Sequence, residues 1–185
     1  MNELRSLQER TFWLIRNTRF MTLATSDNNG EPWASTVNYV PVVDHQIHLL
    51  WYSMKGARHS LNITTRSGVT GSIFRADLVP ALSPLGLDGI QFGGIAREVD
   101  ESSAIAMHAA YYRLNFPDEA IRQNWMLPID EFIGSGVRRF YKLTIDAWWL
   151  LDIDQWLRNK EDRRVELPSP DQLALEFGVT LANTL

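Results

Sequence analysis

The spacing of apolar residues changes early in the chain, from a helical to a strand-like period. Residues 3–17 carry apolar side chains three or four positions apart, which predicts an amphipathic helix. The next segments are rich in β-branched and aromatic residues and are separated by short turn sequences. These predicted strands are residues 20–26, 33–43 and 46–53. Because a parallel crossover needs a dozen residues or more, we expect them to form an antiparallel meander.

The rest of the chain adds three strands and several helical insertions. The further predicted strands are residues 68–75, 89–99 and 138–154, and the paired glycines Gly93 and Gly94 predict a bulge or bend in the second of them. The predicted helices are residues 57–66, 101–116 and 118–126, with Asp100 as the N-cap of the second. Residues 76–88 contain two prolines and predict a loop.

Six evenly spaced strands with helices only at the ends and in insertions predict a mainly β fold, an antiparallel six-stranded barrel with peripheral helices. The length of 185 residues fits a single domain. We divide it into an N-terminal helix (residues 1–18), a barrel with helical insertions (19–154) and a C-terminal extension (155–185).

Composition excludes several classes of function. A net charge of −4 gives no support for nucleic-acid binding, which favours a basic face. The absence of cysteine excludes disulfides, thiolate metal sites and cysteine nucleophiles, and it fits the reducing cytoplasm. We find no apolar signal segment and no run of about 20 apolar residues that could span a membrane. We therefore expect a cytoplasmic protein without membrane or nucleic-acid partners.

Basic and hydroxyl side chains gather where the third predicted strand gives way to a helix. Ser53, Lys55, Arg58 and His59 lie within seven residues of one another. Backbone N–H groups at a helix start attract anions, Arg offers a planar fork to phosphate oxygens, and Lys offers a compact charge. This corner is a candidate phosphate site; the alternative is a solvated basic turn.

The ordered set of segments FMTLATSDNNGEPWASTVNYV, LWYSMKGARHSLNI and GIQFGGIAREVD resembles the pyridoxamine 5′-phosphate oxidase-like FMN-binding split-barrel superfamily. The later AYYRLNFP segment is most similar to its YhbP-like branch. The resemblance implies a split barrel, an FMN cofactor, oxidoreductase activity on a small molecule, and a homodimer with the cofactor near the interface.

The resemblance also implies the roles of individual residues. Ser53 takes the phosphate-binding hydroxyl position, Arg58 and His59 take the adjacent basic positions, and Lys55 is an additional cation. Asn62, one helical turn further on, either supports this pair or solvates the helix. The flavin ring is expected along the second strand, at Ser35, Thr36, Val37 and Asn38, with Trp51 and Tyr52 as possible walls. For Trp148 and Trp149 we weigh a ligand border against a dimer interface, and favour the interface for at least one.

The chain departs from the true oxidases in its chemistry. His59 stands where those enzymes carry Lys, and residues 140–164 do not reproduce their substrate-binding signature. We therefore do not expect oxidation of pyridoxamine 5′-phosphate, and no residue pair stands out as a catalytic acid and base.

A different class of function is a non-catalytic barrel that binds flavin or haem. Haem would require histidine ligation, for which His48, His59 and His108 are the interior candidates. The histidines lack the spacing of a metal pair, and the GSG segment around Ser135 lacks the spacing of a hydrolase nucleophile. We expect no metal site.

Overall fold

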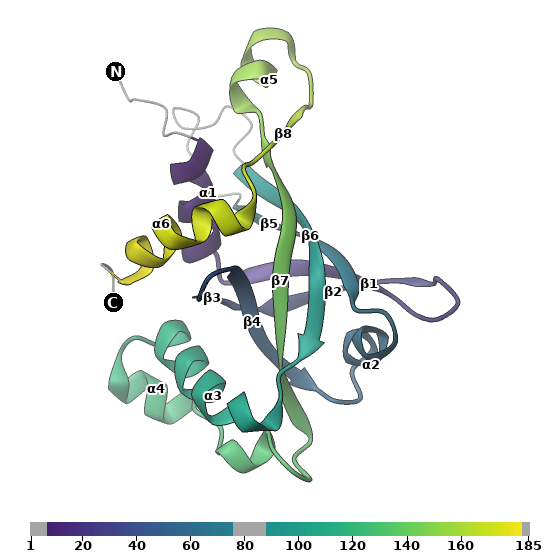
Figure 1. Ribbon diagram of the computed structural model, residues 1–185, viewed down its shortest axis with the longest axis vertical. Helices are drawn as coiled ribbons and strands as arrows, with labels where there is room; N and C mark the ends of the chain where they lie inside the picture. Colours follow the sequence, from purple (N-terminus) through teal and green to yellow (C-terminus); the bar gives the residue numbers. More distant parts are fainter. Residues whose placement is uncertain (1–6, 76–87, 183–185) are drawn as a thin grey trace.

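The structure is a computed structural model that describes residues 7–75 and 88–182. The strands are β1 (Phe20–Ser26), β2 (Pro32–Asn38), β3 (Val40–Val43), β4 (Ile47–Met54), β5 (Gly68–Arg75), β6 (Asp88–Glu98), β7 (Arg138–Leu151) and β8 (Arg164–Glu166). They form one antiparallel sheet in the order β2-β1-β5-β6-β7-β4-β3, with β8 also paired to β7. The sheet curls into the predicted split barrel (Figure 1).

Helices cover the sides and the ends of this sheet. They are α1 (Leu7–Asn17), α2 (Arg58–Thr65), α3 (Glu101–Asn115), α4 (Glu119–Trp125), α5 (Ile153–Asn159) and α6 (Pro170–Ala182), with a short 3₁₀ turn η1 (Ile129–Glu131). α3 and α4 lie together at one end of the sheet, and α1 and α6 lie together on another side (Figure 1). None of the helices in the described part of the chain is both long and apolar enough to cross a membrane.

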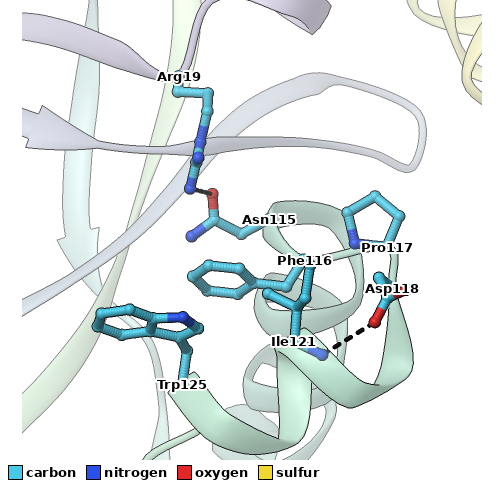
Figure 2. Close-up of a pocket in the computed structure, with 7 residues that line it drawn as sticks. All are labelled: Arg19, Asn115, Phe116, Pro117, Asp118, Ile121 and Trp125. Carbon is cyan, nitrogen blue, oxygen red and sulfur yellow. Dashed lines mark hydrogen bonds between the residues drawn. The ribbon is translucent and has the colours of Figure 1, made fainter.

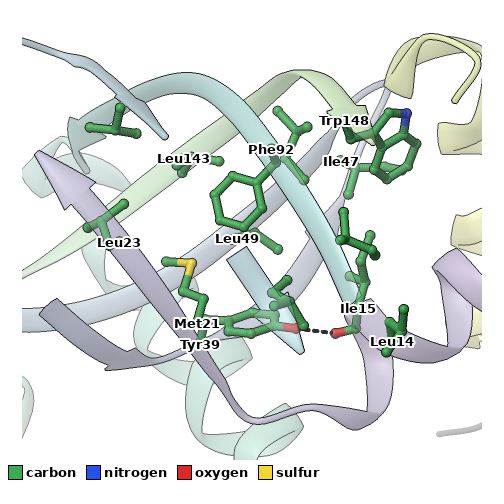
Figure 3. Close-up of a cluster of buried hydrophobic side chains, with 14 of the residues drawn as sticks. Leu14, Ile15, Met21, Leu23, Tyr39, Ile47, Leu49, Phe92, Leu143 and Trp148 are labelled. Carbon is green, nitrogen blue, oxygen red and sulfur yellow. Dashed lines mark hydrogen bonds between the residues drawn. The ribbon is translucent and has the colours of Figure 1, made fainter. Parts of the chain in front are cut away.

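The barrel interior is filled by side chains that alternate along the strands. Met21 and Leu23 of β1 are buried while their neighbours are partly exposed, as period-two strands require. Phe92 and Leu143, from two central strands, meet them inside the barrel (Figure 3). This core confirms the mainly β prediction.

Two helices from opposite ends of the chain close one side of the barrel. Phe12 of α1 and Phe177 of α6 pack with ring centroids 4.8 Å apart. Arg10 fixes α1 to the sheet: its guanidinium donates two hydrogen bonds to Asp88 and a third, of 2.9 Å, to the Leu151 carbonyl. A bidentate, charge-assisted contact of this kind orients a helix as well as stabilising it.

The second predicted strand is wrong as a single element, because it breaks at Tyr39. The Tyr39 N–H donates to the Arg19 carbonyl at 3.0 Å, one residue beyond the last pair of β1 and β2, Phe20 with Asn38. Its buried hydroxyl donates to the Ile15 carbonyl at 2.8 Å and lies 2.9 Å from the Thr18 hydroxyl. The chain therefore leaves β1 after Asn38 and pairs with β4 from Val40.

The end of the final predicted strand is also wrong. β7 stops at Leu151, and Asp152 caps α5 by accepting a hydrogen bond from the Gln155 N–H. With β8 this makes eight strands in the described residues, against six predicted. The apolar C-terminal segment forms α6, a helix that the sequence pattern did not predict. The N-terminal residues of the first predicted helix and residues 76–87 of the predicted loop lie outside the described residues.

The predicted irregularity at the two glycines is confirmed. The pairing of β6 with β7 shifts its register between Gly93 and Gly94. Gly94 approaches the neighbouring strand so closely that an added Cβ would overlap the Thr144 carbonyl oxygen, whereas a Cβ on Gly93 would lie 4.0 Å from the nearest neighbouring atom. The bulge therefore requires glycine at only one of these two positions.

We expect Gly94→Ala to lower the free energy of unfolding by about 1–3 kcal/mol, since two backbones must separate to admit the methyl group. Gly93→Ala, the matched control, should change it by less than about 0.5 kcal/mol. Urea unfolding of both variants measures the difference, and equal losses would contradict the assignment of the close approach to Gly94.

Candidate functional site

A pocket of about 390 Å³ opens where β2, the end of β4, the start of α2 and the insertion helices meet. Five of the predicted cofactor-binding residues line it: Thr36, Val37, Asn38, Ser53 and His59. We call this the barrel-edge pocket. Its volume lies in the range of small-molecule sites.

Local structure explains how the chain reaches this pocket. β4 pairs with β7 as far as Met54, and the Lys55 N–H then donates to the Val137 carbonyl at 2.9 Å. A tight turn, with the Ala57 N–H bonded to the Met54 carbonyl, leads directly into α2. The last side chains of β4 and the first of α2 are therefore held close together.

No side chain caps the first turn of α2 or offsets the partial positive charge of its N–H groups. Its N-cap is Ala57, which has no side chain able to accept from the free N–H groups, and the turn contains no acidic residue. Most helices satisfy these donors with Ser, Thr, Asp or Asn at this position. A helix start of this kind retains its affinity for an anion.

Of the three predicted basic residues, His59 is the one that lines the pocket. Its Nδ1 lies 3.1 Å from the Ser35 hydroxyl, which fixes the imidazole against β2. Its Nε2 is buried and has no hydrogen-bond partner. Burial lowers the pKa of His59 below its ordinary value, because a charged imidazolium is poorly solvated there. The ring therefore has one nitrogen fixed by Ser35 and one that is buried without a partner.

The other two cations lie outside the pocket lining. Lys55 and Arg58 are exposed. The Arg58 guanidinium lies 4.7 Å from the centre of the Trp33 ring, in a cation–π arrangement beside β2. Both cations thus flank the start of α2.

Asn62 and Trp51 serve the structure around the site. Asn62 is only 4% exposed, so it does not solvate the helix, and its Nδ2 donates to the Thr25 hydroxyl at 3.0 Å, which fixes α2 to β1. Trp51 lies in the core against Tyr141, whereas its neighbour Tyr52 lines the pocket.

The sequence did not predict the opposite wall of the pocket. It consists of Arg19, Phe20, Tyr111, Asn115, Phe116 and Trp125. The Tyr111 hydroxyl donates to Asn38 Oδ1 at 2.6 Å, and Asn38 Nδ2 donates to the Arg19 carbonyl at 2.7 Å. Burial raises the pKa of Tyr111 far above its ordinary value, so it remains a donor. The signal was available in the AYYRLNFP segment, which contains three of these residues.

The remaining histidines have partners elsewhere. His48 lies between Asp44 and Thr144, with hydrogen bonds of 3.0–3.1 Å from its two nitrogens. His108 Nε2 lies 2.7 Å from the Leu127 carbonyl inside an aromatic cluster. His45 is exposed. Within residues 7–75 and 88–182 no group of three or more His, Asp or Glu side chains could hold a metal ion.

The two candidate interface tryptophans differ. Trp148 is fully buried in the core, and its indole N–H donates to the Pro168 carbonyl at 2.6 Å, so it is unavailable to a partner. Trp149 is partly exposed and pairs with Glu166 of β8.

The curled sheet, with a pocket at its open edge, defines a split-barrel protein. The chain belongs to the pyridoxamine 5′-phosphate oxidase family, whose model matches residues 7–152. This match confirms the predicted superfamily, while the YhbP-like branch stays a prediction. A search of curated protein sequences finds no significant match.

Solved structures with this fold include proteins of different function. A haem binding protein from Mycobacterium smegmatis is 18% identical over 92% of this chain, with a TM-score of 0.65, and the chain spans 61% of its length. HutZ, the haem storage protein of Vibrio cholerae, is 16% identical over 76% of this chain and 89% of its own, with a TM-score of 0.54. An F420 reductase is 17% identical over 73% of this chain and 92% of its own, with a TM-score of 0.50. At these identities the likeness establishes the fold alone.

We expect Asn62→Ala to lower the free energy of unfolding by about 1–3 kcal/mol, because it leaves the buried Thr25 hydroxyl without its donor. Thr64→Ala, on the exposed face of the same helix, should cost less than about 0.5 kcal/mol. Thermal or urea unfolding measures the stability of both variants. An Asn62→Ala protein as stable as the Thr64→Ala protein would show that the contact with Thr25 does not hold α2 in place.

Proposed function

We propose that the protein binds FMN in the barrel-edge pocket and acts as an FMN-dependent oxidoreductase on a small molecule. The observation that carries this proposal is the uncapped start of α2 beside the unpartnered Nε2 of His59. A buried polar atom without a partner costs about 1–3 kcal/mol, which a bound ligand would recover. The family match supports a flavin as that ligand.

The residues present fit the phosphate of FMN. The Ser53 hydroxyl, the His59 imidazole and the N–H groups of the α2 start would hold it, which are the donors that a dianion requires. Lys55 and Arg58 add positive charge from the rim. Ser35 holds His59 in position and so acts through it.

The residues along β2 fit the ring. Thr36, Val37 and Asn38 offer a hydroxyl, an apolar surface and an amide to a flat heterocycle. Asn38 is held between Tyr111 and the Arg19 carbonyl, so its amide is oriented before any ligand arrives. Bound FMN would supply the redox chemistry, and these residues would orient it.

A homodimer belongs to the same proposal. Phe20 and Trp33, both on the strands that border the pocket, are 55% and 41% exposed. Large apolar side chains next to a cofactor site favour coverage by a second copy of the chain. Trp149 remains available to such an interface, and Trp148 does not.

Haem binding is the second candidate, and His59 is the observation that favours it. Its Nε2 has no hydrogen-bond partner, as an axial ligand requires, whereas the ring nitrogens of His48 and Nε2 of His108 have partners. Two of the structures similar to this chain are described as haem proteins. A Soret band in protein mixed with haemin, abolished by His59→Ala, would support this alternative over FMN.

We expect Arg58→Ala to weaken FMN binding by about 1.5–3 kcal/mol, the scale of a charge-assisted hydrogen bond. Arg66→Ala, at the other end of α2, is the matched control, since Arg66 donates to the Asn28 carbonyl and should leave the affinity unchanged. Quenching of flavin fluorescence measures both affinities. Equal affinities for the two variants would place the phosphate away from this corner.

The affinity for FMN should rise by about three- to tenfold as the pH falls from 8 to 6. Because burial lowers the pKa of His59, its imidazole is neutral in the free protein at pH 8, and a bound dianion raises that pKa again. Binding therefore takes up a proton and strengthens on acidification, until the phosphate itself protonates near its second pKa of about 6.

The matched variant is His59→Gln, which retains a hydrogen-bond donor and does not titrate. Its FMN affinity should not rise between pH 8 and 6, and should fall by about twofold near pH 6 as the phosphate protonates. A wild-type profile that matches that of the variant would exclude His59 from the phosphate site.

A further inference from the structure

A second hollow continues from the barrel-edge pocket toward the insertion helices. It has a volume of about 550 Å³ and is lined by Arg19, Asn115, Phe116, Pro117, Asp118, Ile121 and Trp125 (Figure 2). We call it the outer pocket. Four of its residues, Arg19, Asn115, Phe116 and Trp125, also line the barrel-edge pocket. The two hollows are therefore neighbouring parts of one cleft.

An aromatic stack forms one wall of the outer pocket. The rings of Trp125 and Phe116 are nearly parallel, with an interplanar angle of 5° and centroids 6.4 Å apart, and Phe116 stacks in turn on Tyr112. Trp125 nevertheless remains 67% exposed, and Ile121 beside it is 50% exposed. Exposed apolar side chains beside a pocket provide a surface on which a flat ligand can stack.

A positive charge lies over the same stack. The Arg19 guanidinium is 5.6 Å from the centre of the Phe116 ring, and its Nη2 donates to Asn115 Oδ1 at 3.0 Å. Among the described residues no carboxylate forms an ion pair with it. The one acid of the lining, Asp118, instead caps α4 by accepting from the Ile121 N–H. Arg19 thus has donors available for an anion.

We propose that the outer pocket is the substrate site, and that its ligand is a small planar aromatic carboxylate. The ring would stack on Trp125, and the carboxylate would pair with Arg19. A carboxylate fits better than a phosphate because one guanidinium fork matches its two oxygens, while a dianion calls for more than one cation. This inference rests on the proposed function, since it places the substrate beside the flavin.

The probe for this test is 2-naphthoate, with its uncharged amide as the matched ligand, and calorimetry measures binding to FMN-loaded protein and to FMN-free protein. We expect Trp125→Ala and Arg19→Gln each to weaken 2-naphthoate binding about tenfold. Trp125→Phe keeps a stacking face and should stay within about threefold of the wild type. The amide should bind the wild type and the Arg19→Gln variant equally.

Ile121→Glu provides a variant whose position lines only the outer pocket. The added carboxylate should repel 2-naphthoate while the affinity for FMN, measured separately, stays unchanged. The side chain is exposed, so the substitution should not disturb folding.

The results separate this inference from the function on which it rests. Binding of FMN without binding of 2-naphthoate, or equal 2-naphthoate affinity in all variants, overturns the substrate site and leaves the flavin proposal intact. Binding of 2-naphthoate with the expected variant pattern in a protein that binds no FMN supports the pocket and overturns the flavin proposal. A dimer that dissociates on Trp125→Ala and never binds 2-naphthoate would assign the surface to a second copy instead.

Discussion

The two outer edges of the sheet, β2 and β3, are consecutive in the chain and are joined only through Tyr39. This residue is held in place by two hydrogen bonds that it donates, one from its hydroxyl to the Ile15 carbonyl of α1 and one from its N–H to the Arg19 carbonyl just before β1. On one side of the break, β2 pairs only with β1, and on the other, β3 pairs only with β4. The open seam between β2 and β4 is where the barrel-edge pocket forms.

The break at Tyr39 separates the two sides of the pocket, which are β2 on one side and the end of β4 with the start of α2 on the other. β2 is an edge strand, and its last residue, Asn38, accepts a hydrogen bond from Tyr111 of α3. The end of β4 contributes Ser53, and α2 follows with its uncapped first turn. The protein leaves a helix terminus and a buried imidazole nitrogen unsatisfied at one place, and so gives up stability where a ligand can restore it.

Much of the fold could be predicted because its signals are local. The period-two pattern located the strands, and the paired glycines located the bulge in β6, since both depend on neighbouring residues in the chain. The break at Tyr39 could not be predicted in this way. Tyrosine is favoured in strands, and its hydrogen bonds to Ile15 and Arg19 depend on tertiary contacts. The helix α6 was missed because its docking onto the barrel decides its structure.

The residues of the candidate site likewise divide into those that local sequence signals predict and those that depend on tertiary contacts. Ser53 and His59 could be predicted because a strand end and a helix start adjoin in sequence. Arg19 and Trp125 could not, since they are far apart in the chain and meet only when the insertion helices fold over the seam. The helical spacing of Asn62 left open whether it supports Arg58 and His59 or solvates the helix, because its burial against Thr25 depends on which face of α2 packs on β1.

The ring contact between Phe12 and Phe177 affects the order in which the protein can assemble. The ribosome makes α1 first and α6 last among the described elements, so the eight strands emerge while one side of their core still lacks its cover. The contact that covers this side of the core therefore cannot form until α6 has been synthesised.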